Sequence, residues 1–306
     1  MNGDDVHMVI KMPSNINSSI KGSKVFVRVL NEICSAKNGE DVVLNFSDMK
    51  WIDANLLAAL GAVLEENIGR VRIQYVRNSI RPEIEKLLAK NQFGKYFNLS
   101  KVSDENDTII EYKITDGREI KEFAKYFKES VLFREAMPVL SDGLREKILE
   151  NVLEIFGNAP MHGGCDKVYS CGQIFPQKNV IKFTIANTGH TIKENVIDYY
   201  AHELNKNGYP EDTISWATAE YNSTKKIVNG KSGGLGLFYL KKFVKENKGS
   251  ITICSSDEVW SYNNNKEETD RMNDIFSGTM VTIEINTNDN NIYYLEDEIG
   301  DVFSEF

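Results

Sequence analysis

The first hundred residues alternate between short apolar runs and longer segments that carry apolar residues on one side. Runs rich in Val, Ile and Leu predict strands, and apolar residues three or four positions apart predict helices. Phe26, Leu30 and Ile33 form one such helical face. The predicted strands are 6–11, 42–46 and 70–76, and the helices that follow them are 20–36, 55–66 and 82–90. This order is typical of an α/β fold with a mainly parallel sheet.

A second α/β unit follows a polar segment, residues 99–107, which lacks periodicity and which we interpret as a linker. A long helix is expected to begin at Ser141, a favourable capping residue. Its apolar stripe consists of Leu144, Ile148, Val152 and Ile155. The other predicted strands are 108–113, 180–186, 250–255 and 279–285, and the other helices are 118–128 and 237–247. The polar stretch 257–277 is predicted to be a loop.

This pattern divides the chain of 306 residues into two α/β domains, 1–98 and 108–288, joined by the linker. Residues 289–306 hold six acidic residues and no basic one, and we interpret them as a solvated tail rather than a docking segment. Hydrophobic residues make up 41% of the chain and charged residues 26%, which is the balance of a globular protein with a real core.

The overall charge and the cysteines narrow the choice of partner and compartment. The formal net charge is −9, whereas a protein that neutralises nucleic-acid phosphates needs a surplus of Lys and Arg. The longest apolar run, residues 56–64, is far shorter than the ~20 residues that cross a bilayer. The four cysteines form no CxxC pair. We therefore expect a cytoplasmic protein without a nucleic-acid or membrane partner.

Candidate chemistry begins late in the long helix. Glu154, Asn158 and His162 are spaced by four residues and share a face opposite Ile148 and Val152. A carboxylate and an amide oxygen one turn apart can hold a magnesium ion and a water beside a triphosphate. Taken alone, the same pattern also fits a solvated polar face.

Two glycine-containing segments add to this face. Asn187-Thr-Gly189 follows a strand directly, and its glycine permits a sharp turn and a close approach to a flat ligand. The segment from Lys231 to Leu237, Lys-Ser-Gly-Gly-Leu-Gly-Leu, leads straight into a helix, where free backbone N–H groups suit phosphate oxygens. The latter is neither a Walker A loop nor a dinucleotide fingerprint.

In this order, the three segments resemble the motifs of the GHKL superfamily, which includes histidine kinases, anti-sigma kinases, type II topoisomerases and Hsp90. Glu-x-x-x-Asn-Ala-x-x-His matches its N box, Asn187-x-Gly189 its G1 box, Ser-Gly-Gly-Leu-Gly-Leu its G2 box, and Gly278-Thr279 its terminal Gly-Thr. The resemblance covers residues 108–288 and implies a Bergerat-type α/β sandwich that binds ATP and Mg²⁺.

The resemblance also implies roles for individual residues. Asn158 would ligate magnesium, and Glu154 would orient or deprotonate the attacking group. Asn187, Gly189 and Thr279 would lie at the adenine. In the G2 segment, Gly233, Gly234 and Gly236 would cradle the phosphates, and Lys231 would offer a further phosphate contact. Leu235 and Leu237 of the same segment would also contact the nucleotide. Residues 193–230 would form a lid, in which 221–226 offer further phosphate contacts.

The chain departs from the family pattern at two positions of the G1 box. Asn187 replaces the Asp that reads adenine, so its acceptor is uncharged and its hydrogen bond weaker. Thr191 replaces the second glycine and is expected to restrict the turn. Because His7 is the only histidine ahead of the ATP-binding unit, a conventional histidine kinase is not expected.

The amino-terminal domain resembles the STAS domain of anti-anti-sigma factors across about residues 6–97. The resemblance rests on residues 42–57, Val-Val-Leu-Asn-Phe-Ser-Asp-Met-Lys-Trp-Ile-Asp-Ala-Asn-Leu-Leu, which match that family's strand, switch and following helix. Ala54 stands where the family has its phosphorylated serine, so the usual switch is expected to be missing.

Three functions fit this arrangement. The first is a regulatory protein in which binding or slow hydrolysis of Mg-ATP controls the lid and the association with a protein partner or a second copy. The second is a serine/threonine protein kinase of the anti-sigma-kinase type that phosphorylates a separate protein. The third is a nucleotide-binding scaffold without turnover.

Overall fold

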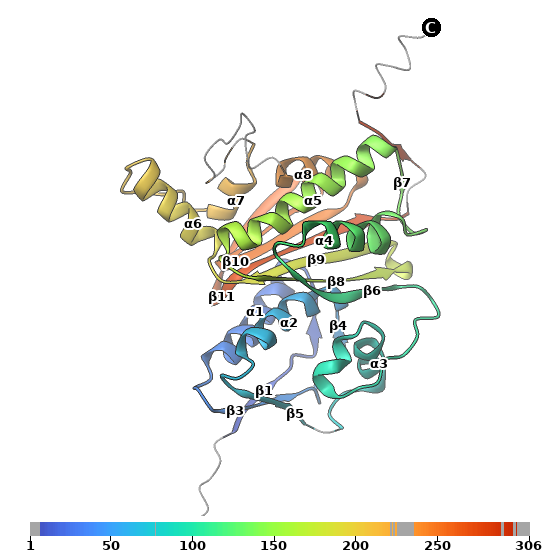
Figure 1. Cartoon of the computed structure of the whole chain (residues 1–306), viewed down its shortest axis with the longest axis vertical. Coiled ribbons are helices and arrows are strands. Elements are labelled where there is room, and N and C mark those ends of the chain that lie inside the picture. Colours follow the sequence, from blue (N-terminus) through green and yellow to red (C-terminus); the bar gives the residue numbers. More distant parts are fainter. Residues whose placement is uncertain are drawn as a thin grey trace, which may run out of the picture.

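The computed structural model describes residues 7–76, 78–220, 222, 224, 236–288, 291–295 and 298. It is a mixed α/β structure built in four layers, with a three-stranded sheet, a helical layer, a five-stranded sheet and a second helical layer (Figure 1). Among the described helices, none combines the length and the apolar character that crossing a membrane requires.

The amino-terminal unit supplies the first two layers. Its strands β1, β3 and β5 pair in parallel in that order, as the alternating pattern predicts. The helices α1 and α2 cover the face of this sheet that looks toward the rest of the chain (Figure 1). The elements of this unit are β1 His7–Lys11, β2 Asn15–Ile16, α1 Ile20–Ser35, β3 Asp41–Asn45, β4 Trp51–Ile52, α2 Leu57–Asn67, β5 Arg72–Tyr75 and α3 Pro82–Lys90.

The second unit is built around an antiparallel sheet in the order β10-β11-β9-β8-β6. Helices α4, α5 and α8 cover its outer face (Figure 1). Its strands are β6 Ile109–Asp116, β7 Val139–Leu140, β8 Lys167–Phe175, β9 Val180–Thr188, β10 Ser250–Asn263, β11 Lys266–Asn286 and β12 Ile292–Tyr293. Its helices are α4 Ile120–Phe127, α5 Asp142–His162, α6 Ile192–Asp198, α7 Thr213–Thr218 and α8 Gly236–Asn247.

The two units share one hydrophobic core, because α1 and α2 pack against the inner face of the five-stranded sheet. Residues Leu57 to Leu64 of α2 are all buried. They lie between the two sheets, and a helix that is apolar on every side needs such burial on both faces. The segment predicted as a linker is also tied down, since Asp104 pairs with Lys90 at 2.8 Å and accepts from the backbone N–H of Ile109.

The prediction of a loop at 257–277 is wrong. Strands β10 and β11 continue through it as a long antiparallel hairpin that turns at Asn264 and Asn265. Both turn residues have positive φ, the conformation of the tight turns that join paired strands. One face of the hairpin is polar and exposed, which hides its strand pattern. Strand β8 was also missed, because it is buried on both faces and lacks polar alternation.

The described part of the tail is docked rather than solvated. Strand β12 pairs in parallel with β7. The carboxylate of Glu298 accepts from the Ser141 hydroxyl at 2.6 Å and from the backbone N–H of Gly143 at 3.1 Å. A carboxylate at this position complements the positive end of α5.

Candidate nucleotide-binding site

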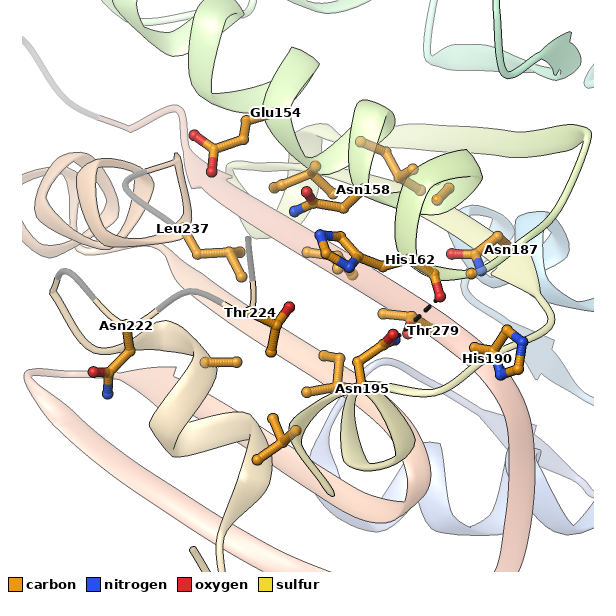
Figure 2. A pocket seen from close by; sticks show the side chains of 18 of the residues that line it. Glu154, Asn158, His162, Asn187, His190, Asn195, Asn222, Thr224, Leu237 and Thr279 are labelled. Carbon is orange, nitrogen blue, oxygen red and sulfur yellow. Dashed lines mark hydrogen bonds between the residues drawn. The ribbon is translucent and has the colours of Figure 1, made fainter. Parts of the chain in front are cut away.

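The first wall of the candidate site is the carboxyl-terminal half of α5. The helix begins where Ser141 caps the backbone N–H of Leu144, and its stripe, which includes Ile148 and Val152, is buried against the sheet. The opposite face is thereby directed at a pocket. There Glu154, Asn158 and His162 follow one another along the helix, as Figure 2 shows.

The second wall is formed by the ends of β9 and β11. Asn187 is paired in register with Thr279, and both line the same pocket as Glu154 and Asn158. The side-chain Nδ2 of Asn187 donates to the carbonyl of Thr188 at 3.0 Å. This bond orients the amide and leaves its Oδ1 as the acceptor. The Thr279 hydroxyl lies 3.0 Å from that of Ser255.

Gly189 has a structural role beside the pocket. Its φ of +112° lies in the region that favours glycine, and a Cβ atom there would lie 2.0 Å from the carbonyl oxygen of Gly163. The glycine brings the turn after β9 against the end of α5, where the N–H of His190 donates to the same carbonyl at 2.9 Å. Gly189 is not among the described residues that line the pocket, although the motif resemblance implies a place at the ligand.

Thr191, at the second glycine position of the G1 box, is the N-cap residue of α6. Its side chain and that of Glu194 form a reciprocal capping box with the backbone. On the next turn, Nδ2 of Asn195 donates to the carbonyl of His162 at 3.1 Å, which ties α6 to α5 (Figure 2). The pattern Thr-x-x-Glu in the sequence was the signal for this helix.

The structure adds lining residues that sequence reasoning did not include in the site. They are His190, Asn195, Trp216 and Ala217, together with apolar side chains from α5, α6 and β11. Trp216 packs against Tyr199 and Tyr200, with ring centroids 5.8 Å apart in both pairs. An aromatic cluster of this kind is not readable from local periodicity, because Tyr199 and Tyr200 lie more than ten residues before Trp216 of α7.

The predicted phosphate-binding segment is described only at its end. Leu237 lines the pocket from α8, which begins at Gly236. Lys231, Gly233, Gly234 and Leu235 lie outside the described residues, as do four members of 221–226. Asn222 and Thr224 are described, and both line the pocket (Figure 2).

The electrostatics of the described lining are simple. With the histidines neutral, Glu154 is the one formally charged residue among the described lining residues. Across the described chain, no group of three His, Cys, Asp or Glu side chains is arranged to hold a metal ion. On α5, the Glu154 carboxylate and the Asn158 amide supply oxygen donors of the kind that suit Mg²⁺.

The opposite face of β9 holds a second polar cluster, which joins the two units. Lys182 lies 3.0 Å from the Asp53 carboxylate and 3.1 Å from that of Glu284. Asp53 is fully buried and also accepts from the Ser18 backbone and the Trp51 ring. Burial alone would raise the pKa of Asp53, but the Lys182 charge and these hydrogen bonds hold that pKa below its usual value.

The pKa of Lys182 moves in the opposite direction. Burial alone would lower it, but the charges of Asp53 and Glu284 raise it above its usual value. Next to this pair, Nδ2 of Asn55 donates to the hydroxyl of Thr184 at 2.8 Å, and that hydroxyl lies 2.8 Å from that of Thr282. The turn that resembles the STAS switch is therefore buried against the second unit.

No protein-family model matches the chain, and no curated protein matches it either.

Proposed function

We propose that the chain is an ATP-binding regulatory protein of GHKL type, in which Mg-ATP occupies the pocket between α5, the ends of β9 and β11, and the lid helices. One observation carries the proposal. A single pocket is lined by four residues that lie in three distant parts of the sequence, namely Glu154, Asn158, Asn187 and Thr279. This is the arrangement that the motif resemblance implies.

The residues present suit the ligand. Magnesium usually binds through one or two protein oxygens, with waters and phosphates completing its shell, and Asn158 offers such an oxygen. The bound ion would neutralise phosphate charge. The Oδ1 of Asn187, fixed by the bond from Nδ2 to Thr188, can accept from the amino group of adenine. The aromatic and aliphatic lining from Trp216 and Val281 suits a flat base.

Glu154 is the one formally charged group among the described lining residues, and it lies one helical turn from Asn158. We assign it the orientation or deprotonation of the attacking group, either water or a substrate hydroxyl. Regulation would act through contacts rather than through the STAS-like turn, because Ala54 has no hydroxyl and is buried. Nucleotide occupancy would bias the position of α6 and α7, and through it the binding of a protein partner or a second copy.

The experiment that tests this proposal identifies what the protein holds after incubation with Mg-ATP. Bound ADP with released phosphate supports slow hydrolysis, and bound intact ATP supports a scaffold without turnover. A labelled protein band after incubation with γ-labelled ATP and cell extract supports the kinase alternative. Recovery of neither nucleotide, with no saturable binding by calorimetry, contradicts nucleotide binding.

A further inference from the structure

A buried carboxylate holds the lid helix α7 against the β10–β11 hairpin. The side chain of Glu258 is fully buried. Its carboxylate accepts from the Thr213 hydroxyl at 2.8 Å and from the backbone N–H of Ile214 at 3.1 Å. These are the first two residues of α7, so the strand fixes the start of the helix.

Arg271 compensates this buried charge from the neighbouring strand. It is the cross-strand partner of Glu258, and its guanidinium lies 2.8 Å from the Glu258 carboxylate. The same side chain also donates to the backbone carbonyl of Glu211 and lies 3.5 Å from the Asp212 carboxylate. Arg271 therefore contacts both the carboxylate that holds α7 and the segment that leads into it.

The strand is irregular at this point. The register between β10 and β11 shifts on both sides of Ser256, whose φ is +56°. A bulge re-aims the side chains that follow it. After the shift, Glu258 and Arg271 face α7, whereas Asp270, the neighbour of Arg271, pairs with Lys24 of α1 at 2.8 Å. Two successive residues of β11 therefore contact different parts of the chain. Asp270 pairs with Lys24 of the amino-terminal unit, and Arg271 pairs with the carboxylate that holds α7.

We propose that Glu258 and Arg271 are positioning residues for the pocket. They hold α7 so that Trp216 and Ala217 form the wall that faces α5. Ile214, fully buried, adds an apolar anchor to the same helix. The inference rests on the proposed function for the identity of the ligand. It adds the Glu258–Arg271 pair as the group that positions α7 beside the pocket.

Arg271→Ala tests this role with two measurements, and Arg271→Lys and Lys24→Ala serve as matched variants. Hydrogen exchange of residues 213–218 is followed without nucleotide, and Mg-ATP affinity is measured by calorimetry. Because Arg271→Ala leaves a buried carboxylate uncompensated, we expect exchange to accelerate and the Kd to rise, each by about tenfold or more. Arg271→Lys keeps the charge and should restore part of both. Lys24→Ala, which breaks the pair on the other side of the strand, should change neither.

The outcomes separate this inference from the proposed function. If the wild-type protein binds Mg-ATP and Arg271→Ala binds it equally well, the positioning role is overturned. Unchanged exchange at 213–218 in Arg271→Ala overturns it as well. If the wild-type protein does not bind Mg-ATP, the proposed function fails, and the exchange measurement still reports whether Arg271 holds α7. Faster exchange and weaker binding, both recovered in part by Arg271→Lys, support the proposal.

Discussion

On one face of β9, Lys182 and Thr184 are buried in hydrogen bonds with the amino-terminal unit, whereas on the other face Asn187 turns its amide toward an open pocket. The first face pairs opposite charges within the chain, and its polar groups stabilise one arrangement of the two units. Polar groups on the second face, with Glu154 and Asn158 opposite them, are directed at space that a ligand can enter. A polar residue in this sheet therefore has to be interpreted from the face on which it lies.

The largest effect is expected from a substitution on the pocket face of β9 and α5, and it should lower the rate of ATP turnover without changing affinity or stability. Glu154→Ala should reduce ATP turnover by about 10²–10⁴-fold, the usual range for loss of a positioned base, while nucleotide affinity and stability stay close to wild type. Turnover is measured by phosphate release and affinity by calorimetry. Glu150→Ala, one turn earlier on the exposed side of α5, is the control. Equal loss of binding and turnover would make Glu154 a structural residue.

A loss of stability is expected from a substitution on the face of β9 that contacts the amino-terminal unit. Lys182→Met leaves the Asp53 carboxylate buried without its cation, and breaking a buried pair in this way costs about 3–5 kcal/mol of unfolding free energy. Urea unfolding measures the change. Lys178→Met is the matched control, because Lys178 is exposed and stacks over Trp51 without a described ion pair. A loss below about 1 kcal/mol, the range of surface ion pairs, would contradict the description of a buried pair.

The same pair should give stability a defined pH dependence. The pKa of Asp53 is lowered, so its contribution is present above the unfolded value of about 3.9 and is lost as the pH falls through the folded value. The pKa of Lys182 is raised, so its contribution is present below about 10.4 and is lost as the pH rises through the folded value.

The difference in unfolding free energy between the wild type and an Asp53→Asn/Lys182→Met variant should therefore be flat between about pH 5 and 9 and should fall at both ends. Urea unfolding across the pH range measures this difference. A difference that changes steadily through neutral pH would assign the dependence to other groups.

Much of the fold was readable from the sequence, because its elements carry clear periodicity. Helix α3 was predicted at its observed bounds, and the parallel pairing of β1, β3 and β5 followed from the alternation of strands and helices. The apolar run of α2 carries a further signal, because a helix that is apolar on every side has to be buried on both faces. The long hairpin was missed because its exposed face is polar.

The residues of the candidate site could not be predicted from local sequence pattern alone. Glu154 and Asn158 share a face by simple helical spacing, but nothing near Asn187 or Thr279 in the sequence says that they meet that face. The motif resemblance supplied that prediction, and the structure places all four residues in one pocket. The contribution of Trp216 depends on Glu258, 42 residues further along the chain, and no local rule connects them.

The most direct test of the central claim is calorimetry of Mg-ATP binding to the wild type, to Asn158→Ala and to Met161→Ala. Asn158 lines the pocket, whereas Met161, less than one turn away on α5, is exposed. We expect saturable binding by the wild type and by Met161→Ala, and binding about 10- to 100-fold weaker by Asn158→Ala without a change in thermal stability. A wild-type protein that binds no Mg-ATP would contradict nucleotide binding, and an Asn158→Ala variant that binds it equally well would contradict the role of Asn158.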